Sequence, residues 1–182
     1  MKKLFLCLAL ALTLALISGP ARAADTIKIG LLAPLTGFAS ADGFSVLESV
    51  KLAVEKVNAE GGVLGKQIEL VYYDDAADSK QAVSLAHKLI NQDKVAAFVA
   101  GSYSMPSRAV APIFDEEEIP LVAAYALHPD LTNGDYTFRN GFLGTTEGRV
   151  AAYTALELFK AKKVALITSD NDFGQTLSQG FN

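Results

Sequence analysis

The sequence predicts an α/β protein whose parallel sheet is flanked by helices on both faces. Four short apolar runs alternate with segments in which apolar residues recur every three or four positions, giving the order strand, helix, strand, helix, strand, helix, strand. The third run, 95–100, contains no polar residue, as expected of a strand that is covered on both faces. Strands joined by helices lie parallel in one sheet, so this order favours a parallel sheet.

Each expected strand is a short apolar run that ends in turn-forming or acidic residues. The first is followed by a loop over residues 34–43, which contains Pro34 and Gly37. The second ends in Asp74-Asp75. The strands are expected at residues 26–32, 68–73, 95–100 and 121–124.

The helices between these strands are identified by apolar residues at helical spacing and by their end signals. Gly61-Gly62 ends the first helix, because glycine adopts the positive φ of a C-terminal cap. The helices are expected from about Leu47 to Gly61, from Asp78 or Ser79 to about Ile90, and from about Pro106 to Glu118.

The chain after the fourth strand has a different composition. A stretch rich in Gly, Thr and Asn between Gly134 and Gly148 is the candidate domain boundary, which divides the chain into 24–140 and 141–182. The elements expected here are an extended piece at 136–139, a helix at 150–160, a strand at 163–168 and a loop at 169–172.

The N-terminus has the pattern of a secretory signal peptide over residues 1–23. Met1-Lys2-Lys3 is positively charged, an uncharged apolar run follows from Leu4 to Ile17, and Ala21-Arg22-Ala23 supplies the small residues of a cleavage site. A membrane anchor is the alternative, but the run is shorter than the roughly 20 residues that a spanning helix needs. The sequence therefore predicts export to the periplasm.

Composition excludes several classes of protein. The 182 residues are 51% apolar, which excludes a disordered chain, and a formal net charge of −4 without a basic stripe argues against nucleic-acid binding. Cys7 is the only cysteine and lies in the signal peptide, so no disulfide or cysteine metal site is expected. His87 and His128 are isolated, and the sequence predicts neither a metal nor a cofactor.

The loop after the third strand is the strongest candidate for a binding site. Ligands of open parallel sheets lie beyond the carboxyl ends of the strands, and here Gly101 to Ser107 places Tyr and three Ser hydroxyls at the start of a helix. A helix N-terminus offers free N–H groups and partial positive charge, which suit a carboxylate. The alternative is that Ser104 or Ser107 only caps the helix.

Other polar residues have simpler interpretations. Asp74 and Asp75 are expected to be solvated carboxylates at the end of a strand, with a phosphate-accepting magnesium site as an alternative that export disfavours. The acidic run from Asp115 to Glu118 is expected on the surface. A secreted hydrolase is disfavoured because no Ser lies in a G-x-S-x-G elbow.

Several segments resemble the branched-chain amino-acid periplasmic binding proteins, which are the substrate-binding components of ABC importers. The resemblance lies in their order and spacing over nearly the whole chain after the signal peptide, since each segment alone is a weak match. The segments are Ile29 to Gly37, Asn58 to Lys66, Asp74 to Ala82, Val95 to Gly101, Ala109 to Pro112 and Asp172-Phe173-Gly174.

The resemblance implies a type I periplasmic binding protein fold, in which two α/β lobes joined by a hinge clamp a ligand. Residues 24–140 would be the first ligand-binding lobe, and 141–182 the hinge crossing and the start of a second. The family has roughly twice as many residues, so the resemblance implies that only the first lobe is complete and that the chain is a fragment.

The family's ligand contacts can be carried over onto this sequence. The loop before the third helix binds the ligand carboxylate, but it is about one residue shorter here, so Ser102 or Ser107 could take the role of Ser104. The loop after the fourth strand binds the ligand ammonium, and Leu127 stands where a Thr is usual, so the resemblance does not specify the ligand. The residues implied are Tyr103, Ser104, Met105, Tyr125, Ala126, Leu127 and, from the second lobe, Phe173.

Two functions are compatible with this fold. The first is a non-enzymatic receptor that delivers an amino acid or related small carboxylate to a membrane permease. The second is a ligand-sensing module of a signalling or regulatory system, and fold alone does not separate the two.

Overall fold

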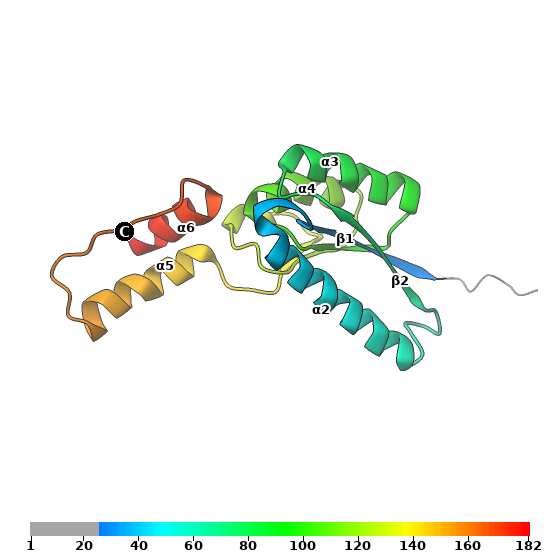
Figure 1. The fold of residues 1–182 in the computed structure, drawn as a ribbon, viewed down its shortest axis with the longest axis horizontal. Coiled ribbons are helices and arrows are strands. Elements are labelled where there is room, and N and C mark those ends of the chain that lie inside the picture. Colours follow the sequence, from blue (N-terminus) through cyan, green and yellow to red (C-terminus); the bar gives the residue numbers. More distant parts are fainter. Residues whose placement is uncertain (1–25) are drawn as a thin grey trace, which may run out of the picture.

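The computed structural model describes residues 26–182, and its strands form one parallel sheet (Figure 1). The strand order is β2-β1-β3-β4-β5, and every neighbouring pair is parallel, which confirms the predicted sheet. Strands β2 and β3 lie on opposite sides of β1. The chain therefore adds β2 on one side of β1 and then crosses to the other side, where β3, β4 and β5 follow in order. The strands are β1 (Ile27–Ala33), β2 (Ile68–Asp74), β3 (Ala97–Ala100), β4 (Leu121–Ala123) and β5 (Thr137–Arg139).

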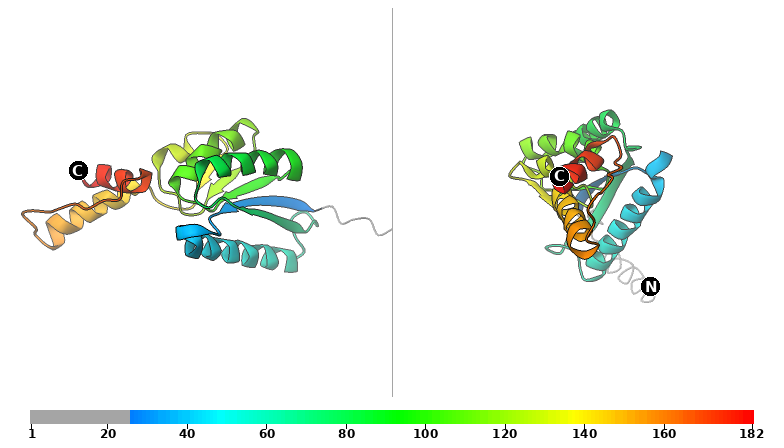
Figure 2. Two further views of the ribbon diagram at one scale, coloured as in Figure 1. Left: turned by 45° about the horizontal axis from the view of Figure 1, so that its top comes forward. Right: turned by 90° about the vertical axis from the view of Figure 1, so that its left-hand side faces the viewer.

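Helices cover both faces of the sheet, as predicted (Figure 2). The long helix α2 (Ser40–Ala59) follows the 3-10 turn η1 (Gly37–Ala39) and covers one face. The other face is covered by α3 (Ser79–Lys88), which continues into the π-helical turn η2 (Leu89–Asp93), and by α4 (Ser104–Glu116).

Two hydrophobic cores lie on opposite faces of the sheet because neighbouring strand residues point in opposite directions. Leu32 and Phe98 face α3 and α4, where the Phe98 and Phe114 rings stack with centroids 4.0 Å apart. Leu31 faces the other way and packs with Leu47 of α2. Both β1 leucines are buried, so β1 is covered on its two faces and anchors the sheet.

The last part of the chain extends away from the sheet as two helices lying side by side (Figures 1 and 2). After the short turn η3 (Pro129–Thr132), α5 (Gly144–Tyr153) runs into the π-helical turn η4 (Thr154–Leu158). The chain then returns so that α6 (Asp172–Phe181) packs along α5 and its N-terminus lies near α4. No helix in residues 26–182 is both long and apolar enough to span a membrane.

Three expectations about the elements are wrong. Helix α2 begins at Ser40, inside the expected loop, and α5 begins at Gly144 rather than at residue 150. Both first turns contain glycines and small polar residues, so apolar spacing does not reveal them. The segment 163–168 is not a strand, because none of the five strands of the described residues pairs with it. The signal peptide predicted at 1–23 lies outside the described residues.

Gly43 allows α2 to cross closely over the chain that leaves β1. A Cβ atom at this position would overlap the carbonyl oxygen of Pro34. We therefore expect Gly43→Ala to lower the free energy of unfolding by about 1–3 kcal/mol, as overpacking does. Helix propensity alone would instead raise it by about 1 kcal/mol.

Urea unfolding of the two chains measures this difference, with Gly141→Ala as the control. At Gly141 the added Cβ would lie at an ordinary 3.6 Å from a methyl group of Leu127, so little change is expected. A Gly43→Ala chain as stable as the parent would contradict the close crossing.

Candidate functional site

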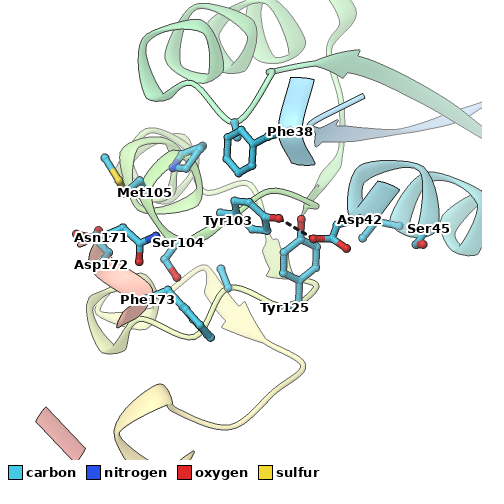
Figure 3. A pocket seen from close by; sticks show the side chains of 14 residues that line it. Phe38, Asp42, Ser45, Tyr103, Ser104, Met105, Tyr125, Asn171, Asp172 and Phe173 are labelled. Atoms are coloured by element: carbon cyan, nitrogen blue, oxygen red, sulfur yellow. Dashed lines mark hydrogen bonds between the residues drawn. The ribbon is translucent and has the colours of Figure 1, made fainter. Parts of the chain in front are cut away.

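A cavity of about 810 Å³ opens at the carboxyl edge of the sheet (Figure 3). Its walls come from the loops after β1, β2, β3 and β4, the first turns of α2 and the start of α6. Because the strands are parallel, all of these loops leave the sheet at the same edge. The predicted binding residues that line it are Tyr103, Ser104, Met105, Tyr125, Ala126 and Phe173, whereas Leu127 does not.

The three serines of the loop after β3 have different roles. The Ser104 hydroxyl lines the cavity and accepts a hydrogen bond from the Leu127 N–H at 3.3 Å, which leaves its proton available to a ligand. Ser102 donates to Oδ1 of Asp75 at 3.1 Å, and Ser107 donates to the carbonyl of Ser102 at 3.1 Å. The geometry therefore favours Ser104 over Ser102 and Ser107 as the ligand contact.

The start of α4 can accept an anion. Tyr103 is the N-cap residue and makes no capping hydrogen bond with its side chain, so the alternative interpretation, in which Ser104 or Ser107 only caps the helix, is wrong. The N–H groups of Ser104 and Met105 belong to the first turn and have no acceptor within the helix. Together with the Ser104 hydroxyl, they form a cluster of donors at the positive end of the helix.

Leu127 supports the site through its backbone hydrogen bonds. Its N–H donates to Ser104, and its carbonyl oxygen accepts from the N–H of Gly144 at 3.0 Å. Both backbone groups are thus used within the protein, and the side chain does not line the cavity. In this structure Leu127 links the loops after β3 and β4 to the start of α5.

Aromatic rings and a carboxylate form the opposite end of the cavity. The Tyr103 hydroxyl donates to Oδ2 of Asp42 on α2 at 2.6 Å, and this bond raises the pKa of Tyr103 (Figure 3). The Tyr103 ring lies 5.9 Å from Phe38 and 5.8 Å from Tyr125, in the latter case edge to face. Burial raises the pKa of Tyr125, whose hydroxyl has no hydrogen-bond partner among residues 26–182.

Asp74 and Asp75 are not the solvated pair that the sequence predicts. Asp74 accepts hydrogen bonds from the N–H groups of Leu35 at 2.7 Å and Ala76 at 2.8 Å, and from the Thr36 hydroxyl. It therefore ties the loop after β1 to the end of β2. Asp75 is fully buried, and this burial raises its pKa.

Arg108 on α4 positions the start of α6. Its guanidinium donates to Asp172 at the first turn of α6 and to Asp130 of η3 at 3.0 Å. Phe173 follows Asp172 and lines the cavity, so this ion pair fixes an aromatic side chain on the far wall. The capping side chain of α6 is Asn171, which accepts from the Gly174 N–H at 2.9 Å.

Sequence reasoning missed Phe38 and Asp42 as cavity residues. Both lie in the stretch expected to be a loop, and only the turn η1 and the early start of α2 direct them to the site. No local motif marks them, since their partner Tyr103 is more than 60 residues away in the chain. His87 is exposed, and His128 accepts a hydrogen bond from the Asp130 N–H.

The structure is an α/β domain with an open cavity at the carboxyl edge of its parallel sheet, and comparison with known proteins identifies its family. The chain belongs to the periplasmic binding protein family, whose model matches residues 26–182. It is 35% identical over 158 residues to the leucine-, isoleucine-, valine-, threonine- and alanine-binding protein of Pseudomonas aeruginosa, covering 86% of this chain and 42% of that relative. The predicted resemblance is thus confirmed.

Solved structures of the same family are also similar. The branched-chain amino acid transporter substrate binding protein of Streptococcus pneumoniae, in complex with isoleucine, matches 86% of this chain and 46% of its own with a TM-score of 0.82 and 32% identity. A solute binding protein of an ABC transporter from Rhodopseudomonas palustris, in complex with 3,4-dihydroxybenzoic acid, matches with a TM-score of 0.74 and 30% identity, covering 86% and 43%. The chain spans less than half the length of these proteins.

The hydrogen bonds to Asp74 predict how stability depends on pH. Partial burial raises the pKa of this carboxyl, but the bonds from Thr36, Ala76 and Leu35 outweigh it, so the pKa lies below its ordinary value. A lowered pKa stabilises the fold above the unfolded-state pKa, and this contribution is lost as the pH falls through the folded-state pKa. The free energy of unfolding of the parent chain should therefore exceed that of Asp74→Asn at pH 7. This difference should become smaller below about pH 4.

Urea unfolding at neutral and acid pH checks this prediction. Asp135→Asn, which removes an exposed carboxylate, is the control and should show no comparable narrowing. A stability gap for Asp74→Asn that is equally large at both pH values would contradict the proposed contribution of the charged form.

Proposed function

We propose that this chain is the ligand-binding part of an extracytoplasmic solute receptor of an ABC importer, and that it binds an amino acid or a related small carboxylate. The observation that carries the proposal is the group of donors at the start of α4, which faces a cavity large enough for such a ligand. A carboxylate there accepts hydrogen bonds from the Ser104 hydroxyl and from the Ser104 and Met105 N–H groups.

The ligands named in the similar structures share one chemical group. Isoleucine and 3,4-dihydroxybenzoic acid differ in every part except the carboxylate. This supports a division of the cavity in which the start of α4 binds the carboxylate and the remaining walls select the rest of the ligand. In this division Ala126 lies beside the bound carboxylate, Phe173 covers it from α6, and Tyr125 belongs to the walls that select the rest of the ligand.

The domain organisation is part of the same proposal. Residues 24–140 form the first lobe, and 141–182 the crossing to a second lobe and its first elements. The departure of α5 and α6 from the sheet supports this division. The predicted signal peptide supports a periplasmic location, and a membrane permease is the partner that a receptor of an importer requires.

Ser104→Ala tests the carboxylate site directly. A hydrogen bond to a charged group contributes on the order of 1.5–3 kcal/mol, so affinity for an amino acid should fall roughly tenfold or more. Because the described walls leave the cavity open, binding to the purified chain is best followed by NMR titration from micromolar to millimolar ligand.

Ser45→Ala is the matched control. Ser45 also lines the cavity, but it lies on α2 and donates to the Ala41 carbonyl at 3.1 Å, away from the start of α4. The Ser45→Ala chain should bind the ligand with the same affinity as the parent. If circular dichroism shows that both chains are folded and Ser104→Ala binds the ligand with the same affinity as the parent, the carboxylate does not bind at Ser104.

A further inference from the structure

Asp75 is a buried carboxyl group that the proposed carboxylate site does not use. It directly follows β2, and its exposed fraction is 0%. Its Oδ2 atom has no hydrogen-bond partner among residues 26–182. Burying a polar atom without a partner costs free energy, so stability alone would favour an apolar residue at this position. Asp75 is therefore a candidate for a functional role.

The other carboxyl oxygen of Asp75 joins the loops after β2 and β3. Oδ1 accepts hydrogen bonds from the Ala77 N–H at 2.9 Å and from the Ser102 hydroxyl at 3.1 Å. Ala77 lines the cavity, and Ser102 is buried. Strands β2 and β3 are both neighbours of β1 and do not pair with each other. The Asp75 side chain thus links two loops that the sheet does not connect directly.

Ser102 is held from two sides and lies just before the start of α4. Its hydroxyl is bonded to Asp75, and its carbonyl oxygen accepts a hydrogen bond from the buried Ser107 hydroxyl at 3.1 Å. The two residues after Ser102 are Tyr103, the N-cap of α4, and Ser104. A shift of Ser102 would therefore move the hydroxyl and N–H groups that the proposed function assigns to the ligand carboxylate.

We propose that Asp75 is a positioning residue of the binding site: through Ser102 it holds the loop after β3 where the Ser104 hydroxyl and the first N–H groups of α4 face the ligand. Asp75 is not among the residues that line the cavity, so it acts on the ligand through this loop. The inference rests on the proposed function, because it takes the start of α4 as the place where the carboxylate binds.

An uncharged acceptor is sufficient for this role. Both donors to Oδ1 are neutral groups, the Ala77 N–H and the Ser102 hydroxyl. Burial also favours the uncharged form of the carboxyl by raising the pKa of Asp75. Asparagine at this position keeps an oxygen that can accept from both donors, whereas alanine removes it.

Asp75→Ala and Asp75→Asn therefore test the acceptor and the charge separately. In NMR titrations of the purified chain, affinity for an amino acid should fall about tenfold in Asp75→Ala, as in Ser104→Ala. Affinity in Asp75→Asn should stay within about twofold of the parent. Ser102→Ala removes the same bond from the other side and should reproduce the loss. The double variant Asp75→Ala/Ser102→Ala should lose no more than either single variant, because both remove one interaction.

The Leu127 N–H reports the position of Ser104 without any ligand, since it donates to the Ser104 hydroxyl. Its amide proton resonance should move upfield in Asp75→Ala and Ser102→Ala as this bond is lost, and should stay in place in Asp75→Asn. Leu89→Ala is the control for a general loss of stability. Leu89 is buried in the larger core and does not line the cavity, so the folded Leu89→Ala chain should keep the affinity and the Leu127 resonance of the parent.

Parent affinity in Asp75→Ala, with the Leu127 resonance unmoved, would overturn the inference and leave the proposed function intact. Binding by Asp75→Asn as weak as that by Asp75→Ala would overturn it too, and so would a tenfold loss in Leu89→Ala. If Asp75→Ala does not fold, Ser102→Ala decides by the same two measurements. If the parent shows no shift of cavity resonances at millimolar amino acid, the proposed function is wrong, and the Leu127 resonance still shows whether Asp75 positions Ser104.

Discussion

The parallel direction of the five strands brings the loops that line the candidate site to one edge of the sheet. The loops after β1, β3 and β4 leave at that edge, and so does the N-terminal, positive end of α4. An antiparallel arrangement would send alternate loops to the opposite edge. Side-chain contacts then fix the spacing of the loops: Asp74 holds the loop after β1, Ser104 joins the loops after β3 and β4, and Arg108 brings in α6.

The sequence was sufficient for the sheet and most of the helices, because their apolar spacing reflects burial directly. The fully apolar run around Phe98 is the clearest case, since that residue lies in the larger core. The first turns of α2 and α5 could not be predicted in this way. Gly43 and Gly144 are buried in them by close approach to other parts of the chain, which leaves no periodic signal. The segment 163–168 has strand composition, but a strand also needs a neighbour to share its hydrogen bonds.

The candidate site could likewise be predicted only in part. The loop around Ser104 could be located from the sequence, since strand ends and helix starts have local signals, and the family resemblance named the residues that line the cavity there. Their role in binding stays a prediction. Asp42 was not found as a cavity residue, because only the fold brings it to Tyr103 from a distant segment of the chain. The burial of Asp75 was missed for a similar reason, since it depends on packing beneath the loop after β3.

The central claim is that the start of α4 binds a carboxylate, and backbone amide chemical shifts test it most directly. A carboxylate that accepts from the Ser104 and Met105 N–H groups should move both amide proton resonances downfield as an amino acid is added. The same amino acid with its carboxylate converted to an amide should leave them nearly unchanged, because an uncharged group is a weaker acceptor at the positive end of a helix. Equal shifts with both compounds, or shifts confined to other parts of the chain, would contradict the account.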